Sequence, residues 1–87
     1  MKSKTTTSFR KLYRQLSPEI KRRACKAYLL WKRYPDAAGL YFKRVSGAAP
    51  IYSVRIGRDY RALGVMKDDT MAWYWIGKHD VYERLLK

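Results

Sequence analysis

Apolar residues recur at helical spacing near the start of the chain. In the segment TSFRKLYRQL they occupy positions i, i+3, i+4 and i+7, namely Phe9, Leu12, Tyr13 and Leu16. This spacing predicts a short amphipathic helix, with Thr7 or Ser8 available as its N-cap.

A second and longer helix is predicted between Ser17 and Pro35. Ser17 is a favourable N-cap, Pro18 suits the first helical position, and Glu19 complements the positive end of the helix dipole. Apolar side chains then follow along one face, at Ile20, Ala24, Ala27, Tyr28 and Trp31. Pro35 ends the helix because a proline disfavours the helical conformation of the residue before it. The two segments together predict a pair of antiparallel helices joined by a tight turn.

After Pro35 the apolar period changes from near four to two. Short segments rich in β-branched and aromatic residues follow at 40–45, 51–56, 60–66 and 70–76. The connections between them are too short for parallel crossovers, so these strands must pair antiparallel. A further strand around Lys4–Thr7 would extend the sheet, and the segment HDVYERLLK predicts a short helix at the end of the chain.

These elements define an α+β fold class. We expect a single domain over residues 1–87. In it, an N-terminal helical hairpin packs on a small antiparallel sheet of about four strands, and a short C-terminal helix follows.

The net charge is strongly positive. The chain has 20 Lys or Arg against 7 Asp or Glu, a formal net charge of +13 at pH 7. Residues 1–34 hold eleven basic side chains and one acid, a net of +10, whereas residues 35–87 hold nine and six, a net of +3. Hydrophobic residues make up 47% of the chain, which suffices for a core, so this charge is carried on a globule. Nucleic acid is therefore the leading class of partner.

Several classes of site lack the residues that they need. Cys25 is the only cysteine and His79 the only histidine, which excludes an internal disulfide and leaves no cluster of metal ligands at usable spacing. Asp68 and Asp69 lie in a predicted turn, and the sequence contains no phosphate-binding glycine loop. We expect no metal and no cofactor. We also expect a soluble cytoplasmic protein without a membrane span, because no apolar run approaches about 18 residues.

Two arginines of the predicted sheet need separate interpretation. Arg55 falls on the face of strand 51–56 opposite the apolar Val54, as on the solvated side of an amphipathic strand. Strict alternation places Arg61 on the same face as Leu63. Arg61 therefore either lies at the mouth of its strand or is turned outward by a bulge near Gly57–Asp59.

The remaining polar residues fit metal-free cleavage of RNA. That reaction needs a deprotonated 2′-hydroxyl, cations to hold the charge on the phosphorane, and a proton for the leaving 5′-oxygen. Histidine titrates near pH 6.5 and can serve either proton transfer, whereas arginine supplies charge and bidentate phosphate contacts. Residues of these types come from three neighbouring segments of the predicted sheet: Arg55, Arg58, Arg61, Lys78, His79 and Tyr82.

Each of these residues also has a purely structural interpretation. His79 follows a strand and is suited to begin a helix, and Tyr82 is suited to anchor the last helical turn on the core. The aromatic run 73–75 is typical of a central strand, although one ring on the far face can stack on a base. The same holds for Tyr41 and Phe42.

The order of these elements and four local strings resemble the RelE/ParE superfamily of bacterial type II toxin–antitoxin toxins. The strings are RYPDA, LYFKRVSG, YSVRIGRDYRALGV and WIGKHDVYERLL. The third matches the superfamily's pattern of a strand, a basic turn and a Tyr-Arg pair entering the next strand. The fourth matches its ending, in which a glycine and a basic residue precede a histidine and a tyrosine. The likeness covers nearly the whole chain.

The resemblance implies a function and a role for each candidate residue. Many members are ribosome-dependent endoribonucleases that cut mRNA without a metal, and each is silenced by an antitoxin encoded beside it. By analogy, Arg61 holds the scissile phosphate, Arg55 stabilises transition-state charge with help from Lys78, His79 is the general acid or base, and Tyr82 stacks on a base or orients a proton. The basic residues expected to bind RNA are Arg58, Lys78, Lys43 and Arg44.

One departure from the superfamily leaves the function open. Strongly active RelE proteins carry two alternating lysines on the strand where this chain has Ser53 and Arg55. ParE members share the fold but inhibit DNA gyrase. The alternatives are therefore an endoribonuclease acting on mRNA at the ribosome, a ParE-like gyrase inhibitor, and a basic RNA-binding module that has lost turnover. The sequence does not specify the oligomeric state.

Overall fold

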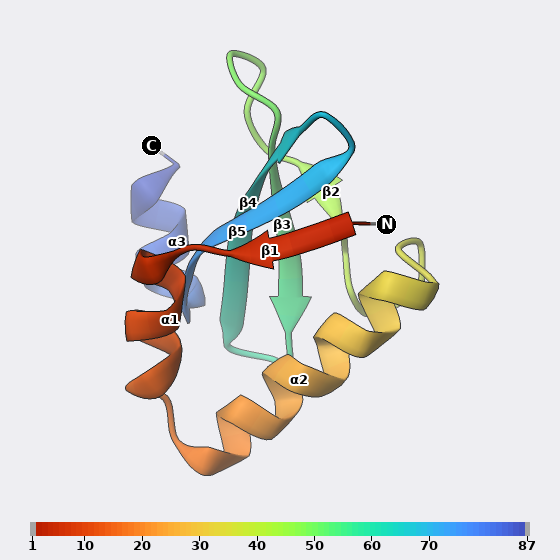
Figure 1. Cartoon of the computed structure of the whole chain (residues 1–87). Coiled ribbons are helices and arrows are strands. Elements are labelled where there is room, and N and C mark those ends of the chain that lie inside the picture. Colours follow the sequence, from red (N-terminus) through yellow and green to blue (C-terminus); the bar gives the residue numbers. More distant parts are fainter. Residues whose placement is uncertain (1, 87) are drawn as a thin grey trace.

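The computed structural model describes residues 2–86 and contains, over that range, three helices and a five-stranded sheet (Figure 1). The elements follow in the order β1 (Lys2–Thr5), α1 (Thr7–Arg14), α2 (Pro18–Arg33), β2 (Lys43–Arg44), β3 (Ile51–Ile56), β4 (Tyr60–Lys67), β5 (Thr70–Lys78) and α3 (His79–Leu85). This arrangement confirms the predicted α+β fold class. None of the helices within residues 2–86 has the length and apolar character needed to cross a lipid bilayer.

The sheet is mixed rather than purely antiparallel. Its strand order is β1-β5-β4-β3-β2, and β1 pairs parallel with β5 while the other neighbours pair antiparallel. The N-terminal strand begins earlier than predicted, at Lys2, and ends at Thr5. It can run parallel because the two helices, followed by the other strands, give the chain the long crossover that a parallel pair requires.

The strand predicted at 40–45 is reduced to Lys43–Arg44. Tyr41 has a φ of 47°, which breaks the extended backbone, so pairing with β3 starts only after it. At the opposite end of the sheet, Asp68 and Asp69 form the β4–β5 turn with φ angles of 50° and 64°. Two successive positive φ angles are typical of the tight turns that match the twist of a hairpin, which confirms the turn predicted there.

Side-chain caps fix where the helices begin. The Thr6 Oγ1 accepts a hydrogen bond of 3.1 Å from the Phe9 amide, so Thr6 is the N-cap of α1, and the predicted choice of Thr7 or Ser8 is wrong by one residue. For α2 the prediction is confirmed, because the Ser17 Oγ accepts from the Ile20 amide at 3.3 Å.

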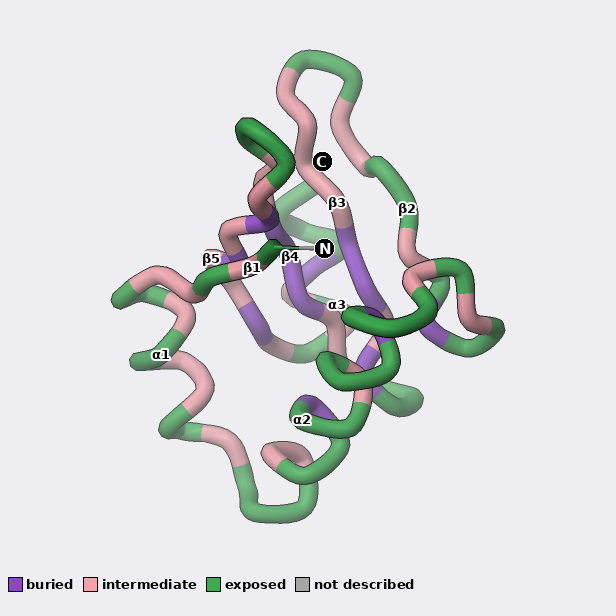
Figure 2. Tube along the Cα trace, turned by 45° about the vertical axis from the view of Figure 1, so that its right-hand side comes forward, coloured by how far each residue is buried: buried purple, intermediate pink, exposed green. Residues whose placement is uncertain are grey.

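The hydrophobic core lies between the two N-terminal helices and one face of the sheet. Its buried residues are Ala24, Trp31, Leu40, Val54, Ile56, Ala62, Met71, Trp73 and Ile76. The Trp31 ring meets the Trp73 ring edge to face, with centroids 5.1 Å apart. Figure 2 shows that the buried segments gather in the central strands β3, β4 and β5.

The helical hairpin is more open than the sequence suggests. Helix α1 packs on β5 and α2 packs on β3, and the two helices diverge from their connecting turn (Figure 1). Helix α1 has no buried residue, and α2 buries only Ala24 and Trp31 along its 16 residues. The helices therefore cover the sheet incompletely.

Candidate functional site

The register of the strands brings two arginines together on the face of the sheet opposite the hydrophobic core. Arg55 on β3 is the Cα partner of Arg61 on β4, and Arg61 is in turn the partner of Gly77 on β5. Paired residues of antiparallel strands point to the same face, and the neighbouring Ile56 points into the core. The only register irregularity on β4 lies between Leu63 and Gly64, beyond Arg61. Arg61 is the second residue of β4 and so lies at the mouth of its strand, which is one of the two predicted alternatives. No bulge at 57–59 is needed to place it.

Helix α3 begins beside these arginines. The His79 backbone amide donates a hydrogen bond of 2.7 Å to the Asp59 carbonyl, which fixes the start of α3 to the β3–β4 turn. The His79 and Tyr82 rings then stack one helical turn apart, with centroids 5.6 Å apart and planes 25° apart. The structure therefore brings all four predicted catalytic residues into one region.

Tyr82 forms the floor of this region. It is only 6% exposed, and its hydroxyl lies 3.3 Å from the Oγ of Ser53, to which it donates. The Arg61 guanidinium lies 5.8 Å from the ring centroid. Little of the Tyr82 ring is exposed to solvent, which favours the second of its two expected roles, orienting a proton, over stacking on a base. Its contacts suit it to position Arg61 and His79.

The two arginines carry charge without a carboxylate partner. In the described part of the chain the ion pairs are Arg23–Glu19 and His79–Glu83, which leaves both Arg55 and Arg61 outside them. Burial lowers the pKa of Arg61, and the like charge of Arg55 lowers it further. The carboxylate of Glu83 partly offsets this effect on Arg61 without forming an ion pair with it. Two guanidinium groups that lack an ion-pair partner on one face suit an anion such as a phosphate.

Contacts with the rest of the fold hold these guanidinium groups in place. The Arg55 Nε donates to the Gly57 carbonyl at 2.9 Å, and the Arg61 Nη1 donates to the Tyr60 carbonyl at 3.2 Å. Each guanidinium retains further N–H donors for a ligand.

His79 is held by an acid that the sequence analysis did not include. Its Nε2 lies 2.9 Å from the Glu83 Oε1, and its Nδ1 is buried without a hydrogen-bond partner. This pairing places the proton of a neutral His79 on Nε2, on the exposed side of the ring. The His79 side chain is 39% exposed, so the imidazole can be approached from solvent. The i, i+4 spacing on a helix is the signal by which Glu83 could have been identified.

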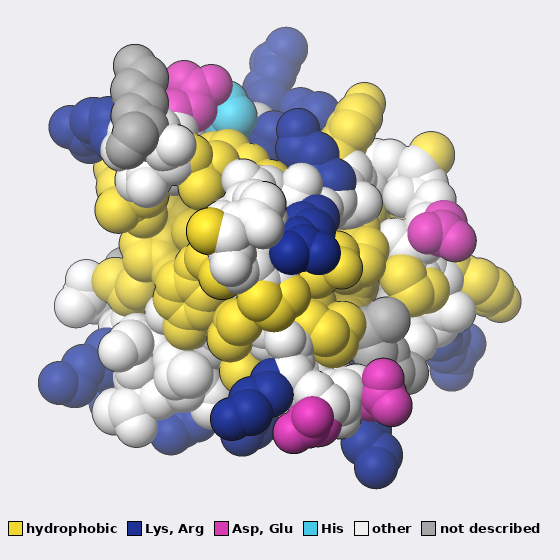
Figure 3. Space-filling view, turned by 90° about the horizontal axis from the view of Figure 1, so that it is seen from above, with side chains coloured by type: hydrophobic (Ala, Val, Ile, Leu, Met, Phe, Trp, Pro, Cys, Tyr) yellow, Lys and Arg dark blue, Asp and Glu magenta, His cyan; other side chains and the backbone are white. Residues whose placement is uncertain are grey.

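The remaining predicted RNA-binding residues divide between the two faces. Lys43 is the Cα partner of Ser53 and shares the face of the arginines, and Arg58 is exposed in the turn next to the site. Lys78 is exposed at the end of β5, but it is the Cα partner of Tyr60, so strand alternation directs it to the other face. Arg44 pairs with Tyr52 on the other face, and its Nε donates to the Ser46 carbonyl at 2.9 Å. In Figure 3 the histidine lies next to an acidic side chain, and several basic side chains gather nearby.

A second residue missed by the sequence analysis is Tyr41, which was considered for stacking but not assigned to the site. It is 60% exposed, and the Arg55 guanidinium lies 5.2 Å from its ring centroid. The period-two pattern assigned it to a strand and so concealed its position in a bend.

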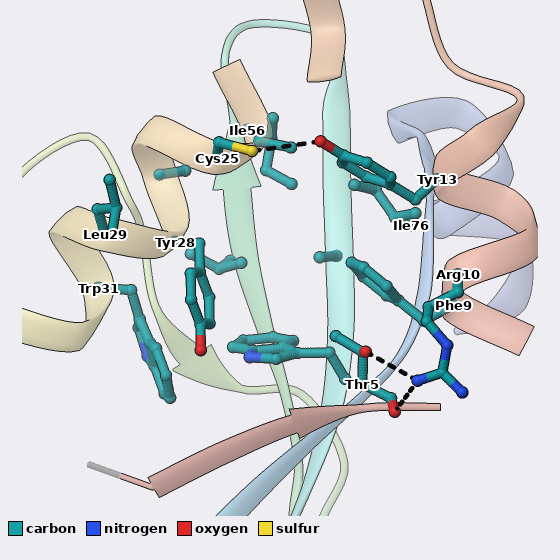
Figure 4. A pocket seen from close by; sticks show the side chains of 15 residues that line it. Thr5, Phe9, Arg10, Tyr13, Cys25, Tyr28, Leu29, Trp31, Ile56 and Ile76 are labelled. Atoms are coloured by element: carbon teal, nitrogen blue, oxygen red, sulfur yellow. Dashed lines mark hydrogen bonds between the residues drawn. The ribbon is translucent and has the colours of Figure 1, made fainter. Parts of the chain in front are cut away.

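An apolar cleft of about 520 Å³ opens between α1, α2 and the sheet (Figure 4). Its walls include Phe9 of α1, Leu29 of α2 and Trp73 of the sheet. The Tyr13 hydroxyl and the Cys25 thiol are 3.2 Å apart across it, and this hydrogen bond, together with burial, raises the pKa of Tyr13. The cleft is on the core side of the sheet and is separate from the arginine site.

Residues 2–86 contain no group of three or more His, Cys, Asp or Glu side chains close enough together to hold a metal ion. The arginine site presents two guanidinium groups, one imidazole held by a carboxylate, and the tyrosine beneath them.

Comparison with known proteins gives a consistent result. The family described as "ParE-like toxin domain" matches residues 18–84. No curated protein matches the sequence.

Solved structures share the fold at low sequence identity. A chain of the RelB–RelE antitoxin–toxin complex from Methanococcus jannaschii has a TM-score of 0.70 and 15% identity, over 95% of this chain and 98% of that one. YafQ from E. coli gives 0.73 and 12%, over 92% and 94%. The YoeB/ParE toxin from Agrobacterium tumefaciens gives 0.70 and 19%, over 91% and 99%. Because the sequence identities are below 20%, these comparisons show that the fold is shared and show nothing further.

Proposed function

Since the chain belongs to the ParE-like toxins of the RelE/ParE superfamily, we propose that this type II toxin is an endoribonuclease that cleaves mRNA on the ribosome without a metal. The observation that carries the proposal is the cluster of Arg55, Arg61 and His79 on one face of the sheet. It combines an anion site with a group able to move a proton at neutral pH.

In this proposal the two arginines bind the scissile phosphate. Arg61 contacts it from the middle of the face, and Arg55 holds the negative charge that grows on the phosphorane when the 2′-oxygen attacks. Lys78, the exposed residue that precedes α3, adds positive charge at the rim. Oriented donors of this kind contribute most where charge develops in the transition state.

His79 supplies the proton transfer. In the protonated form of His79, which Glu83 holds at Nε2, the imidazolium gives one proton to the 5′-oxygen as the bond from phosphorus to that oxygen breaks and is left as the neutral imidazole, and the proton of the 2′-hydroxyl goes to solvent. Tyr82 and Ser53 lie behind the reacting groups and keep the imidazole and the Arg61 guanidinium in register. The products expected are a 2′,3′-cyclic phosphate and a free 5′-hydroxyl.

Induced expression followed by mapping of RNA 5′ ends tests this function in cells. We expect growth arrest and new 5′ ends in phase with codons, and we expect both to disappear in His79→Ala and Arg61→Ala. Arg44→Ala is the matched control, because Arg44 lies on the other face of the sheet. New ends that persist in His79→Ala would exclude the proposed proton transfer.

A second candidate function is inhibition of DNA gyrase. The match to the ParE-like family favours it, and so does Ser53, which stands where strongly active nucleases of the superfamily carry a lysine and is buried beneath Tyr82. Growth arrest with intact mRNA, together with loss of gyrase supercoiling activity in the presence of the purified protein, would favour this candidate over the nuclease.

We further propose that a cognate antitoxin binds in the apolar cleft between α1, α2 and the sheet. Similar structures include toxin–antitoxin complexes, and the cleft walls are almost wholly apolar beside a strongly basic N-terminal region. An acidic amphipathic helix matches both properties. Leu29 lines the cleft and is 64% exposed, so Leu29→Asp is expected to abolish binding of the antitoxin encoded by the adjacent gene while the protein still folds.

Tyr34→Asp is the matched control for the cleft. Tyr34 is also 64% exposed but does not line the cleft. Equal antitoxin affinity of the Leu29→Asp variant and the wild type, measured by calorimetry, would place the antitoxin elsewhere.

A further inference from the structure

Tyr41 lies in a bend whose neighbours are anchored on both sides. Leu40 is 3% exposed, and its carbonyl accepts a hydrogen bond from the Arg55 amide. The Phe42 ring stacks on Tyr52 with centroids 5.1 Å apart and meets the Trp31 ring edge on at 5.8 Å. The backbone on either side of Tyr41 is therefore held against β3 and the core.

Between these anchors the Tyr41 side chain lies against Arg55 and is exposed to solvent. Its ring is 60% exposed although it is large and aromatic. Its φ of 47° is uncommon for any residue other than glycine, and such a conformation persists only where surrounding contacts impose it. Strained residues of this kind are concentrated at functional sites.

The exposed ring belongs to the arginine site. The Arg55 guanidinium lies 5.2 Å from the ring centroid, over one face of the ring. Tyr41 is also near enough to Arg61 to influence the pKa of that arginine. Tyr41 as a whole stays 60% exposed despite this contact, next to the position at which the phosphate is proposed to bind.

We infer that Tyr41 is a stacking platform for a base of single-stranded RNA next to the scissile phosphate, with Arg55 joining the platform to the phosphate site. This inference rests on the proposed nuclease function and gives the site a base-binding residue. Tyr82 does not supply one, because it is buried and bonded to Ser53. An aromatic platform accepts every base but holds the larger purines more strongly, so Tyr41 also influences the choice of cut site.

Two readouts test this inference. The first is the fluorescence of a short single-stranded RNA that contains 2-aminopurine, which is quenched when the base stacks on a ring. The second is single-turnover cleavage of mRNA on programmed ribosomes, with a purine or a pyrimidine at the tested position. The variants are Tyr41→Phe, Tyr41→Ala and Tyr41→Gly, with Tyr34→Ala as the control at similar exposure outside the site.

We expect wild type and Tyr41→Phe to quench the fluorophore equally, and Tyr41→Ala and Tyr41→Gly to lose the quenching and about tenfold or more in affinity. The dependence of binding on salt should not change, since no charge is removed. The preference for a purine at the tested position should disappear in both variants. Because glycine tolerates a positive φ, the loss in Tyr41→Gly cannot be attributed to backbone strain.

The outcomes separate this inference from the proposed function. If wild type cleaves and Tyr41→Ala cleaves and quenches like wild type, the platform is refuted and the nuclease stands. If wild type does not cleave but quenching still depends on Tyr41, the nuclease is refuted and the platform stands. If quenching is absent from the wild type, or persists in Tyr41→Ala, the platform is refuted whether or not the RNA is cut.

Discussion

At the scale of single residues, Arg61 carries its charge in surroundings that disfavour it. Its pKa is lowered first by burial and then by Arg55, so the protonated guanidinium is less stable in the folded state than in the unfolded state. For a base with a lowered pKa, this unfavourable contribution is present at neutral pH and disappears only as the pH rises through the folded pKa. Through burial and the like charge of Arg55, the charge of Arg61 therefore opposes folding.

We predict that Arg61→Leu reduces the rate of cleavage by about a hundredfold or more, as removal of an oriented transition-state donor typically does. The same change should leave the midpoint of thermal unfolding unchanged or higher. Single-turnover cleavage and a thermal melt at pH 7 measure the two effects. A parallel loss of activity and stability would make Arg61 a structural residue.

The sequence predicted which residues lie at the site better than it predicted how far each of them is buried. Alternation on β3 predicted the direction of Arg55 correctly. The segment after β5 was predicted as a short helix, which places His79 and Tyr82 one turn apart. Burial of Tyr82 agrees with the structural interpretation of that residue as an anchor of the last helical turn. Exposure of Tyr41 was not predictable, because it depends on the positive φ of that residue and on the tertiary contacts of its neighbours. These are tertiary effects that local patterns do not encode.

At the scale of elements, α3 is fixed to the sheet by few contacts. The hydroxyl of Tyr82 donates to the Ser53 Oγ, and both groups are buried. The His79 amide bonded to the Asp59 carbonyl holds the start of the helix. The position of the imidazole depends on this docking.

We predict that Tyr82→Phe and Ser53→Ala each lower the free energy of unfolding by about 1 kcal/mol, because each leaves one buried partner without its hydrogen bond. The double variant should cost less than the sum of the two. Chemical denaturation of all four proteins measures the coupling. Strict additivity would mean that this hydrogen bond does not stabilise the docked helix.

The same scale shows where strand prediction fails. The antiparallel pairs β3–β4 and β4–β5 follow from short turns between alternating segments. The parallel pairing of β1 with β5 joins the two ends of the chain, so no local pattern encodes it. The early start of β2 was wrong because the aromatic residues at 41 and 42 favour strands wherever they occur, and only tertiary contacts turn Tyr41 out of the sheet.

At the scale of the whole molecule, the net charge of +13 is expected to dominate encounter with the ribosome. The affinity of the protein for the ribosome should therefore fall steeply as the salt concentration rises. Arg58 is exposed in the turn next to the site, whereas Arg44 lies on the opposite face and is bonded to the Ser46 carbonyl. If RNA contacts the arginine face, Arg58 should contribute to RNA binding and Arg44 should contribute little.

We predict that Arg58→Gln reduces the slope of the logarithm of the ribosome-binding constant against the logarithm of salt concentration by about one, as expected for one lost phosphate contact. Arg44→Gln should leave the slope close to that of the wild type. Binding titrations at several salt concentrations measure both slopes. Equal changes in the two variants would indicate that charge acts diffusely and that the arginine face is not the RNA-binding surface.

The most direct test of the central claim is cleavage of mRNA on purified ribosomes with a single 2′-deoxynucleotide at the mapped cut site. Metal-free cleavage by the 2′-hydroxyl predicts that the all-ribose mRNA yields a 2′,3′-cyclic phosphate and a 5′-hydroxyl end. It also predicts that the deoxy-substituted mRNA is not cut at that site. Cleavage of the substituted mRNA at the same position would contradict the account, and so would an intact all-ribose mRNA under conditions in which the protein arrests growth.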